Sequence, residues 1–118
     1  MAVRGIRGAT AAKADTSEAV LAATTELLQA VVAANQVRND DIASIIFTVT
    51  PDLRSEYPAR AARLLGWNDV ALLGAAEIDV PAGLKRCIRV LLHVNTDKSA
   101  TEIKHIYLHE ARALRPDR

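Results

Sequence analysis

Apolar and polar residues alternate along Leu84–Val94 in the way that is typical of a β-strand. Successive side chains of a strand point to opposite faces, so the even-numbered positions from Ile88 to Val94 give one wholly apolar face. Arg89 lies on the other face. A guanidinium stays charged at ordinary pH and is costly to bury unpaired. The position therefore predicts a carboxylate partner or an anionic ligand, unless this is an edge strand whose arginine reaches solvent.

Two helical patterns predict helices that cover a sheet. Asp15 and, three residues later, Glu18 have the spacing of a capping box, and apolar residues then recur at helical spacing as far as Asn35. This stretch predicts a long amphipathic helix. Pro58 is well placed to begin a shorter helix that runs to Leu65 and stops at a glycine.

The remaining periodic stretches predict strands. In Met1–Thr10, Gly5 and Gly8 flank Arg7, which would let a ligand or another backbone come close. Ile42–Thr50 is almost continuously apolar and suits a central strand covered on both faces.

Farther along, Val70–Leu73 predicts another strand, and Gly74–Ala76 predicts a flexible segment that leads to Glu77. If Pro81–Gly83 forms a hairpin turn, Glu77 lies across from Arg89, and a cross-strand pair becomes the simplest explanation of both charges.

The C-terminal part predicts three short elements. Ser99–Glu102 has a second capping-box pattern, His105–Tyr107 predicts a brief extended segment, and Leu108–Ala113 predicts a helical turn that breaks before Arg115-Pro116.

Composition narrows the class of protein. The chain has 118 residues, enough for one domain over residues 1–118, and a net charge of +1 gives no general attraction to nucleic acid or membranes. One cysteine cannot form an intrachain disulfide, and the N-terminal sequence lacks an apolar signal core, so we expect a cytoplasmic location. No apolar run is expected to span a bilayer.

The histidines and the cysteine do not form a recognisable catalytic motif. His105 and His109 are four residues apart, but Ile106 stands where a zincin motif needs glutamate, so we expect no metal site. Cys87 lies within a predicted strand and is interpreted as a small buried hydrophobe.

The remaining polar candidates suggest binding rather than nucleophilic attack. Arg7, Arg89, Glu77 and Tyr107 provide two cations, a carboxylate and a phenol near strands, without a base-activated nucleophile. Such a set suits holding and polarising a small polyanion. Arg60, in contrast, has a simpler interpretation as the surface partner of Glu56.

Six motifs together resemble one family closely: Arg-Gly-Ile-Arg-Gly-Ala-Thr at 4–10, Thr-Pro-Asp-Leu at 50–53, Tyr-Pro-Ala-Arg-Ala at 57–61, Lys-Arg-Cys-Ile-Arg-Val at 85–90, His-Ile-Tyr-Leu at 105–108 and Leu-Arg-Pro-Asp at 114–117. In this combination the chain resembles the small, monofunctional, trimeric chorismate mutases. The resemblance implies an α+β fold, with a mixed β-sheet covered by one long and one shorter helix and three chains forming a pseudo-α/β barrel.

The implied activity is the [3,3] rearrangement of chorismate to prephenate in phenylalanine and tyrosine biosynthesis, without a cofactor or metal. By resemblance, Arg89 donates to the ether oxygen that leaves the ring, and Arg7 and Tyr107 hold the enolpyruvyl side chain. Glu77 accepts a hydrogen bond from the ring hydroxyl. An unliganded structure could therefore hold Glu77 and Arg89 near each other.

The resemblance also implies sites shared between two subunits of a homotrimer. The loop that assists Glu77 consists of Leu73, Gly74, Ala75 and Ala76. The stretch that closes the cleft contributes Tyr57, Ala59, Arg60 and Arg63. Relatives carry Phe, Lys and Cys where this chain has Tyr57, Arg60 and Gly74, so only the backbone of Gly74 could contact the substrate.

Two alternatives stay open from the sequence. A trimeric imine deaminase of similar shape would also place arginines in clefts between subunits. A non-catalytic regulatory module that binds an aromatic amino acid is the other.

Overall fold

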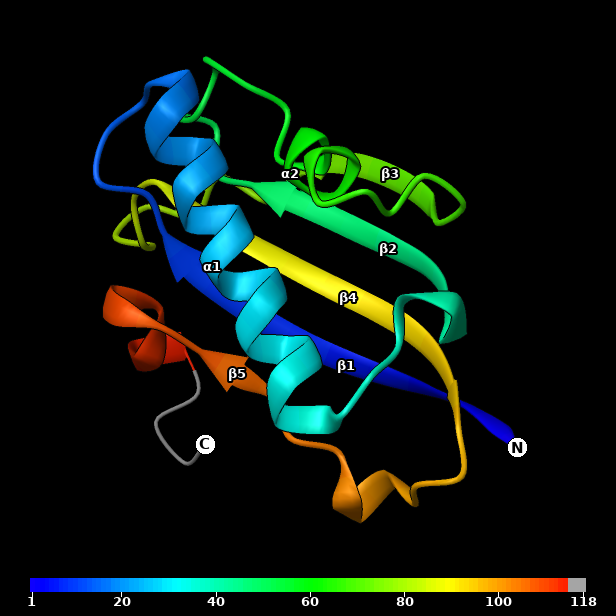
Figure 1. Cartoon of the computed structure of the whole chain (residues 1–118). Coiled ribbons are helices and arrows are strands. Elements are labelled where there is room, and N and C mark those ends of the chain that lie inside the picture. Colours follow the sequence, from blue (N-terminus) through cyan, green and yellow to red (C-terminus); the bar gives the residue numbers. More distant parts are fainter. Residues whose placement is uncertain (115–118) are drawn as a thin grey trace.

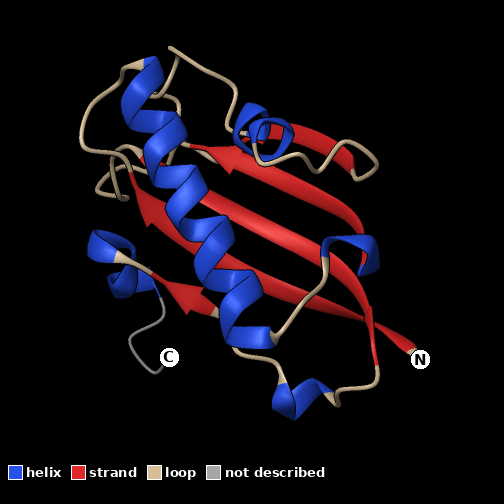
Figure 2. Ribbon diagram, in the orientation of Figure 1, coloured by secondary structure: helices blue, strands red, loops and turns tan. Residues whose placement is uncertain are grey.

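The chain folds into a five-stranded sheet with its two α-helices packed against one face (Figures 1 and 2). The computed structural model describes residues 1–114. Its strands are β1 (Ala2–Ala11), β2 (Ile42–Val49), β3 (Ala71–Ala76), β4 (Cys87–Thr96) and β5 (Ile106–Tyr107), and its α-helices are α1 (Ser17–Asn35) and α2 (Ala59–Leu64). Short 3-10 helices cover Asn39–Asp41 (η1), Ala100–Glu102 (η2) and His109–Leu114 (η3).

The sheet is mixed, as predicted. Its strand order is β3-β2-β4-β1-β5; β4 runs antiparallel to both β1 and β2, whereas β2–β3 and β1–β5 are parallel pairs. The α+β fold with one long and one shorter helix is therefore confirmed. The predicted break before Arg115-Pro116 lies outside the described residues.

The position of β4 removes one interpretation of Arg89. This strand is the middle one of five, so the edge-strand alternative is wrong. The predicted hairpin through Pro81–Gly83 is also wrong, because β3 pairs with β2 and not with β4. The crossover through α2 brings β3 in parallel beside β2, and residues 77–86 then carry the chain back to the other edge of β2. In addition, β3 continues through Gly74–Ala76, which the sequence predicted as a loop.

The core lies between α1 and the sheet. Figure 1 shows α1 running diagonally across β4 and β1. Its side chains Leu27, Leu28 and Val31 are fully buried, as are Phe47 of β2 and Leu92 of β4. The even-numbered face of β4 is thus the core face, as the alternation predicted.

By length and composition alone, α1 could cross a membrane, contrary to the expectation from the sequence. One side of α1 packs against the sheet, and core helices of globular proteins can meet the same criteria of length and composition.

The N-terminus of α1 differs from the prediction. Thr16, and not Asp15, is the N-cap residue, since its hydroxyl accepts a hydrogen bond from the amide of Ala19 at 3.1 Å. Asp15 instead accepts hydrogen bonds from the amides of Arg54 and Ser55 at 2.9 and 3.0 Å. The second capping box, at Ser99–Glu102, is confirmed.

The opposite face of the sheet is open over β3 and β2, whereas Ala111 of η3 and Tyr107 cover Ala9 of β1 on that face. Leu73, Ile46, Leu91 and Arg7 are register partners in one row across β3, β2, β4 and β1. The side chain of Leu73 is 62% exposed, and Ile46 is half-buried. The prediction that Ile42–Thr50 is covered on both faces is therefore wrong for a single chain.

Gly8 is a position at which side chains of α1 pack closely against the backbone of β1. A Cβ added there would lie 3.0 Å from Val90, 3.1 Å from Leu27 and 3.2 Å from Val31. The space beside Arg7 is thus taken up partly by the helix, on the face opposite to the arginine.

We expect Gly8→Ala to destabilise the protein by about 1–3 kcal/mol, because an extra methyl group over-packs the interface with α1. Urea unfolding at one protein concentration measures the change. Gly74→Ala is the matched control, since a Cβ at that position meets nothing within 4 Å. It should be neutral or stabilise by up to about 1 kcal/mol. Equal losses in both variants would contradict this packing argument.

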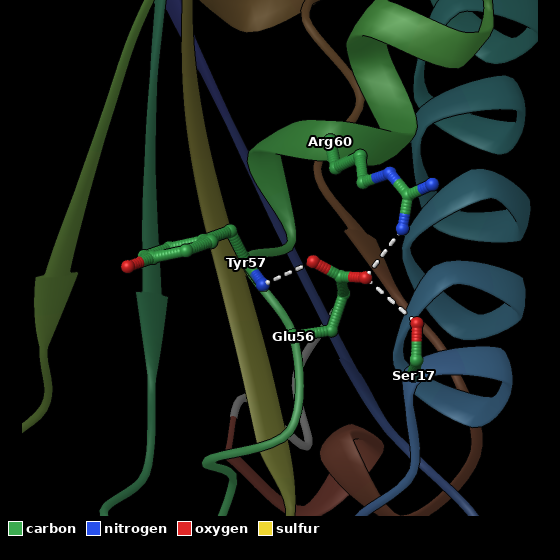
Figure 3. Close-up of polar contacts among 4 residues, drawn as sticks. All are labelled: Ser17, Glu56, Tyr57 and Arg60. Atoms are coloured by element: carbon green, nitrogen blue, oxygen red, sulfur yellow. Dashed lines mark hydrogen bonds and ion pairs between the residues drawn. The ribbon is translucent and has the colours of Figure 1, made fainter.

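Glu56 fastens the loop before α2 to the start of α1 (Figure 3). Its carboxylate accepts hydrogen bonds from the hydroxyl of Ser17 and the guanidinium of Arg60, each at 2.7 Å, and from the amide of Tyr57 at 3.0 Å. These bonds, led by the one from Ser17, lower the pKa of Glu56 to about 2. The surface pairing predicted for Arg60 is confirmed.

This lowered pKa predicts a pH-dependent contribution to stability. The ionised carboxylate is favoured in the folded state, so its contribution is complete above the ordinary pKa of 4.5 and is lost as the pH falls toward about 2. We expect Glu56→Gln to lower the urea midpoint most at pH 6, and less at pH 3. The same substitution at exposed Glu110 is the control. A deficit that stays constant from pH 6 to pH 3 would contradict this role of the Glu56 carboxylate.

Candidate active site

The pairing register of the strands places the polar side chains of the open face close to one another. Thr48 of β2 and Ala9 of β1 are the register partners of Arg89 on either side, and Ala9 is in turn the partner of Tyr107 in β5. Arg7 is two residues before Ala9 and therefore on the same face. Four strands thus deliver these side chains to one region.

Glu77 reaches this region from the end of β3. Its amide donates a 2.9 Å hydrogen bond to the carbonyl of Val49, which continues the pairing with β2 one residue beyond the strand. Together Arg7, Arg89, Glu77 and Tyr107 line a hollow of about 270 Å³. The structure therefore brings together all four residues that the sequence predicted as catalytic.

Glu77 and Arg89 form a loose ion pair. Oε2 of Glu77 lies 3.7 Å from Nε of Arg89, beyond hydrogen-bond distance, and the side chains are 23% and 41% exposed. The expected proximity is thus confirmed, although the contact crosses β2 and does not come from a hairpin. Arg89 keeps donors that a ligand can use.

Arg7 has an unsatisfied donor. Its Nε is buried and has no hydrogen-bond partner among the described residues, whereas its backbone amide donates to Nδ1 of His105 at 3.0 Å. A buried charged donor without an acceptor is costly, which is typical of a position that a bound anion completes. Tyr107, 8% exposed, lines the same hollow.

Cys87 takes no part in this chemistry. Its side chain is 2% exposed, and burial raises the pKa of the thiol to about 11. The interpretation as a small buried hydrophobe is confirmed. Within residues 1–114 no group of three or more His, Cys, Asp or Glu side chains is arranged to hold a metal ion.

The other predicted residues lie apart from Arg89. Tyr57 is 77% exposed and lines a separate hollow of about 580 Å³ with Gly74–Ala76. In Figure 3 its ring points away from the carboxylate of Glu56 and from Arg60. Arg60 and Arg63 are exposed on α2, and Ala59 is half-buried at its start. Leu73 is on the open face of the sheet. A single chain therefore brings only part of the predicted site together.

One residue of the hollow was missed by the sequence analysis. The hydroxyl of Thr48 donates a short hydrogen bond to Oε2 of Glu77, and Thr48 lines the hollow with Arg89. A hydroxyl within the apolar run of β2 was the available signal. Threonine is common in strands, so that signal is weak by itself.

Comparisons with known proteins agree with this geometry. The sequence profile of the family "Chorismate mutase type I" matches residues 3–118. A chorismate mutase AroH from Thermus thermophilus is 50% identical over 116 residues, which cover 98% of this chain and 95% of that protein. The corresponding AroH of Bacillus subtilis is 42% identical over 118 residues, covering 99% and 93%.

A solved structure of a chorismate mutase from Clostridium thermocellum has the same fold. It superposes with a TM-score of 0.92 at 49% identity, over 93% of this chain and 98% of that one. On sequence and on fold, this chain belongs to the chorismate mutase type I family.

Proposed function

We propose that this chain rearranges chorismate to prephenate in the hollow around Arg89. The observation that carries the proposal is the convergence of two arginines with a carboxylate and a phenol, one arginine having a buried donor without a partner among residues 1–114. Chorismate offers the matching groups, which are two carboxylates, a ring hydroxyl and an ether oxygen. The reaction is unimolecular, so it needs no nucleophile.

Arg89 has the central role in the proposed mechanism. Negative charge grows on the ether oxygen as its bond to the ring lengthens, and a guanidinium donor stabilises that charge more in the transition state than in the ground state. Because Arg89 lies in the middle strand of the sheet, its backbone is held before the substrate arrives. Such preorganisation avoids a reorganisation cost during the reaction.

The other residues restrict the substrate. Arg7 and Tyr107 hold the enolpyruvyl carboxylate, Glu77 accepts a hydrogen bond from the ring hydroxyl, and the backbone of Leu73–Ala76 assists it. Binding in a compact conformer brings the reacting carbons together. Electrostatics and restriction together must lower the barrier by at least about 8 kcal/mol, the lower end for enzymes.

We propose that the active protein is a homotrimer and that each site is completed by a neighbouring subunit. Two observations support this: Tyr57, Ala59, Arg60 and Arg63 lie away from Arg89 within one chain, and the face carrying Leu73 is largely uncovered. Exposed apolar surface of this kind is typical of an interface. The substrate would then bind where this face of one chain meets the loop before α2 of another.

We also propose that residues 1–118 act as one domain in the cytoplasm. Support comes from the core between α1 and the sheet and from the single cysteine, which has no partner for an intrachain disulfide.

Arg89→Ala should reduce kcat at least about 10²-fold, because removal of one oxyanion-type donor has an effect of this size. Loss of chorismate absorbance measures the rate. Arg38→Ala, at an exposed arginine whose side chain is 77% exposed, is the control and should keep full activity. If Arg89→Ala turns over chorismate as fast as the parent protein, the proposed mechanism is wrong.

Light scattering should give the mass of three chains for the parent protein. We expect Leu73→Asp to give a smaller species with lower activity, because it places a charge in the proposed interface. Ala22→Asp, on the exposed side of α1, is the matched control and should stay trimeric. A trimeric Leu73→Asp protein, or a monomeric parent, would contradict the assembly proposed from this face.

A further inference from the structure

We propose that Thr48 is a positioning residue, which holds the carboxylate of Glu77 away from Arg89 and directs it toward the substrate. The inference rests on the proposed role of Glu77 in binding the ring hydroxyl. Its basis is the hydrogen bond from the hydroxyl of Thr48 to Oε2 of Glu77, inside the hollow that both residues line with Arg89.

The backbone places Thr48 well for this task. Thr48 is the direct register partner of Arg89, so both side chains leave neighbouring strands on the same face. β2 is bonded on both sides, by β3 and β4. A β-branched side chain on such a strand has little rotational freedom, which makes the Thr48 hydroxyl a fixed donor.

Without a hydrogen-bond partner, the side chain of Glu77 would have more conformational freedom than its neighbours in the hollow. It lies one residue beyond β3, and its side chain has several rotatable bonds. Oε2 lies between the Thr48 hydroxyl and Nε of Arg89, at 3.7 Å from the latter. Within residues 1–114, Oε1 receives no hydrogen bond and remains the acceptor for a ligand hydroxyl.

Loss of the hydroxyl would change the balance between these contacts. An unrestrained Glu77 could close the 3.7 Å gap and form a hydrogen-bonded pair with Arg89, as opposite charges do in a partly desolvated site. That pair would engage the guanidinium donors that the ether oxygen needs. It would also turn the carboxylate away from the ring hydroxyl.

Thr48→Val tests this role, because valine keeps the branched shape and lacks the hydroxyl. We expect kcat/KM to fall about tenfold, mainly through kcat, with an unchanged urea midpoint. Thr48→Ser retains the donor and should stay within about threefold of the parent. Full activity in Thr48→Val, or equal defects in the two variants, would overturn the inference.

A double-mutant cycle with Glu77→Ala, which leaves no acceptor for the Thr48 hydroxyl, separates positioning from a general structural role. If Thr48 acts through Glu77, adding Thr48→Val to Glu77→Ala should cause no further loss. Prephenate binding by calorimetry reads the same cycle if turnover of Glu77→Ala is too slow to measure. A tenfold loss in both backgrounds would refute the coupling.

The two proposals fail differently. If Glu77→Ala has the parent kcat/KM, the role of Glu77 itself is wrong, and the role of Thr48 is wrong with it. If Glu77→Ala is defective but Thr48→Val is not, only the inference about Thr48 is wrong.

Discussion

The pairing register of β1, β2 and β4 is the constraint on which the rest of this structure depends. Because side chains alternate along a strand, a slip of one residue would turn Arg89 into the core and expose the apolar face. The buried residues on that face, such as Leu92 and Phe47, therefore fix the direction in which Arg89 points. Hydrophobic packing on one side of the sheet determines the electrostatics on the other.

The polar side of the sheet is incompletely satisfied. Arg89 has only a loose pair with Glu77, and Arg7 has a buried donor without a partner among the described residues. Such positions cost stability in the free protein, and an anionic ligand recovers that cost on binding. A site of this kind suits a reaction that needs conformational restriction and charge stabilisation. The role that we propose for Thr48 is consistent with this, since its hydrogen bond to Glu77 would keep that carboxylate from pairing more closely with Arg89.

Within one chain, the candidate substrate-binding groups divide between two regions. The strands carry Arg7, Arg89 and Tyr107, whereas the loop before α2 carries Tyr57 on the outside of the molecule. The hydrogen bonds of the Glu56 carboxylate hold that loop in a defined position against α1. A fixed, outward-facing loop and a largely uncovered sheet face both fit the site between subunits that we propose.

The sequence by itself determined most of the local structure and pointed to the candidate site residues. Alternation in β4 and the helical spacing of α1 match the burial of these elements, whereas Arg7, Arg89, Glu77 and Tyr107 were predicted from residue type and family resemblance. Only the tertiary structure decided what lies next to what. The pairing of β3 with β2, the route by which Glu77 reaches Arg89 across β2, and the hydrogen bond from Thr48 all depend on strand order. Asp15 is not the N-cap residue that the sequence predicted, because its side chain accepts a hydrogen bond from a loop 39 residues away. Strand order is decided by long-range packing, which no local pattern records.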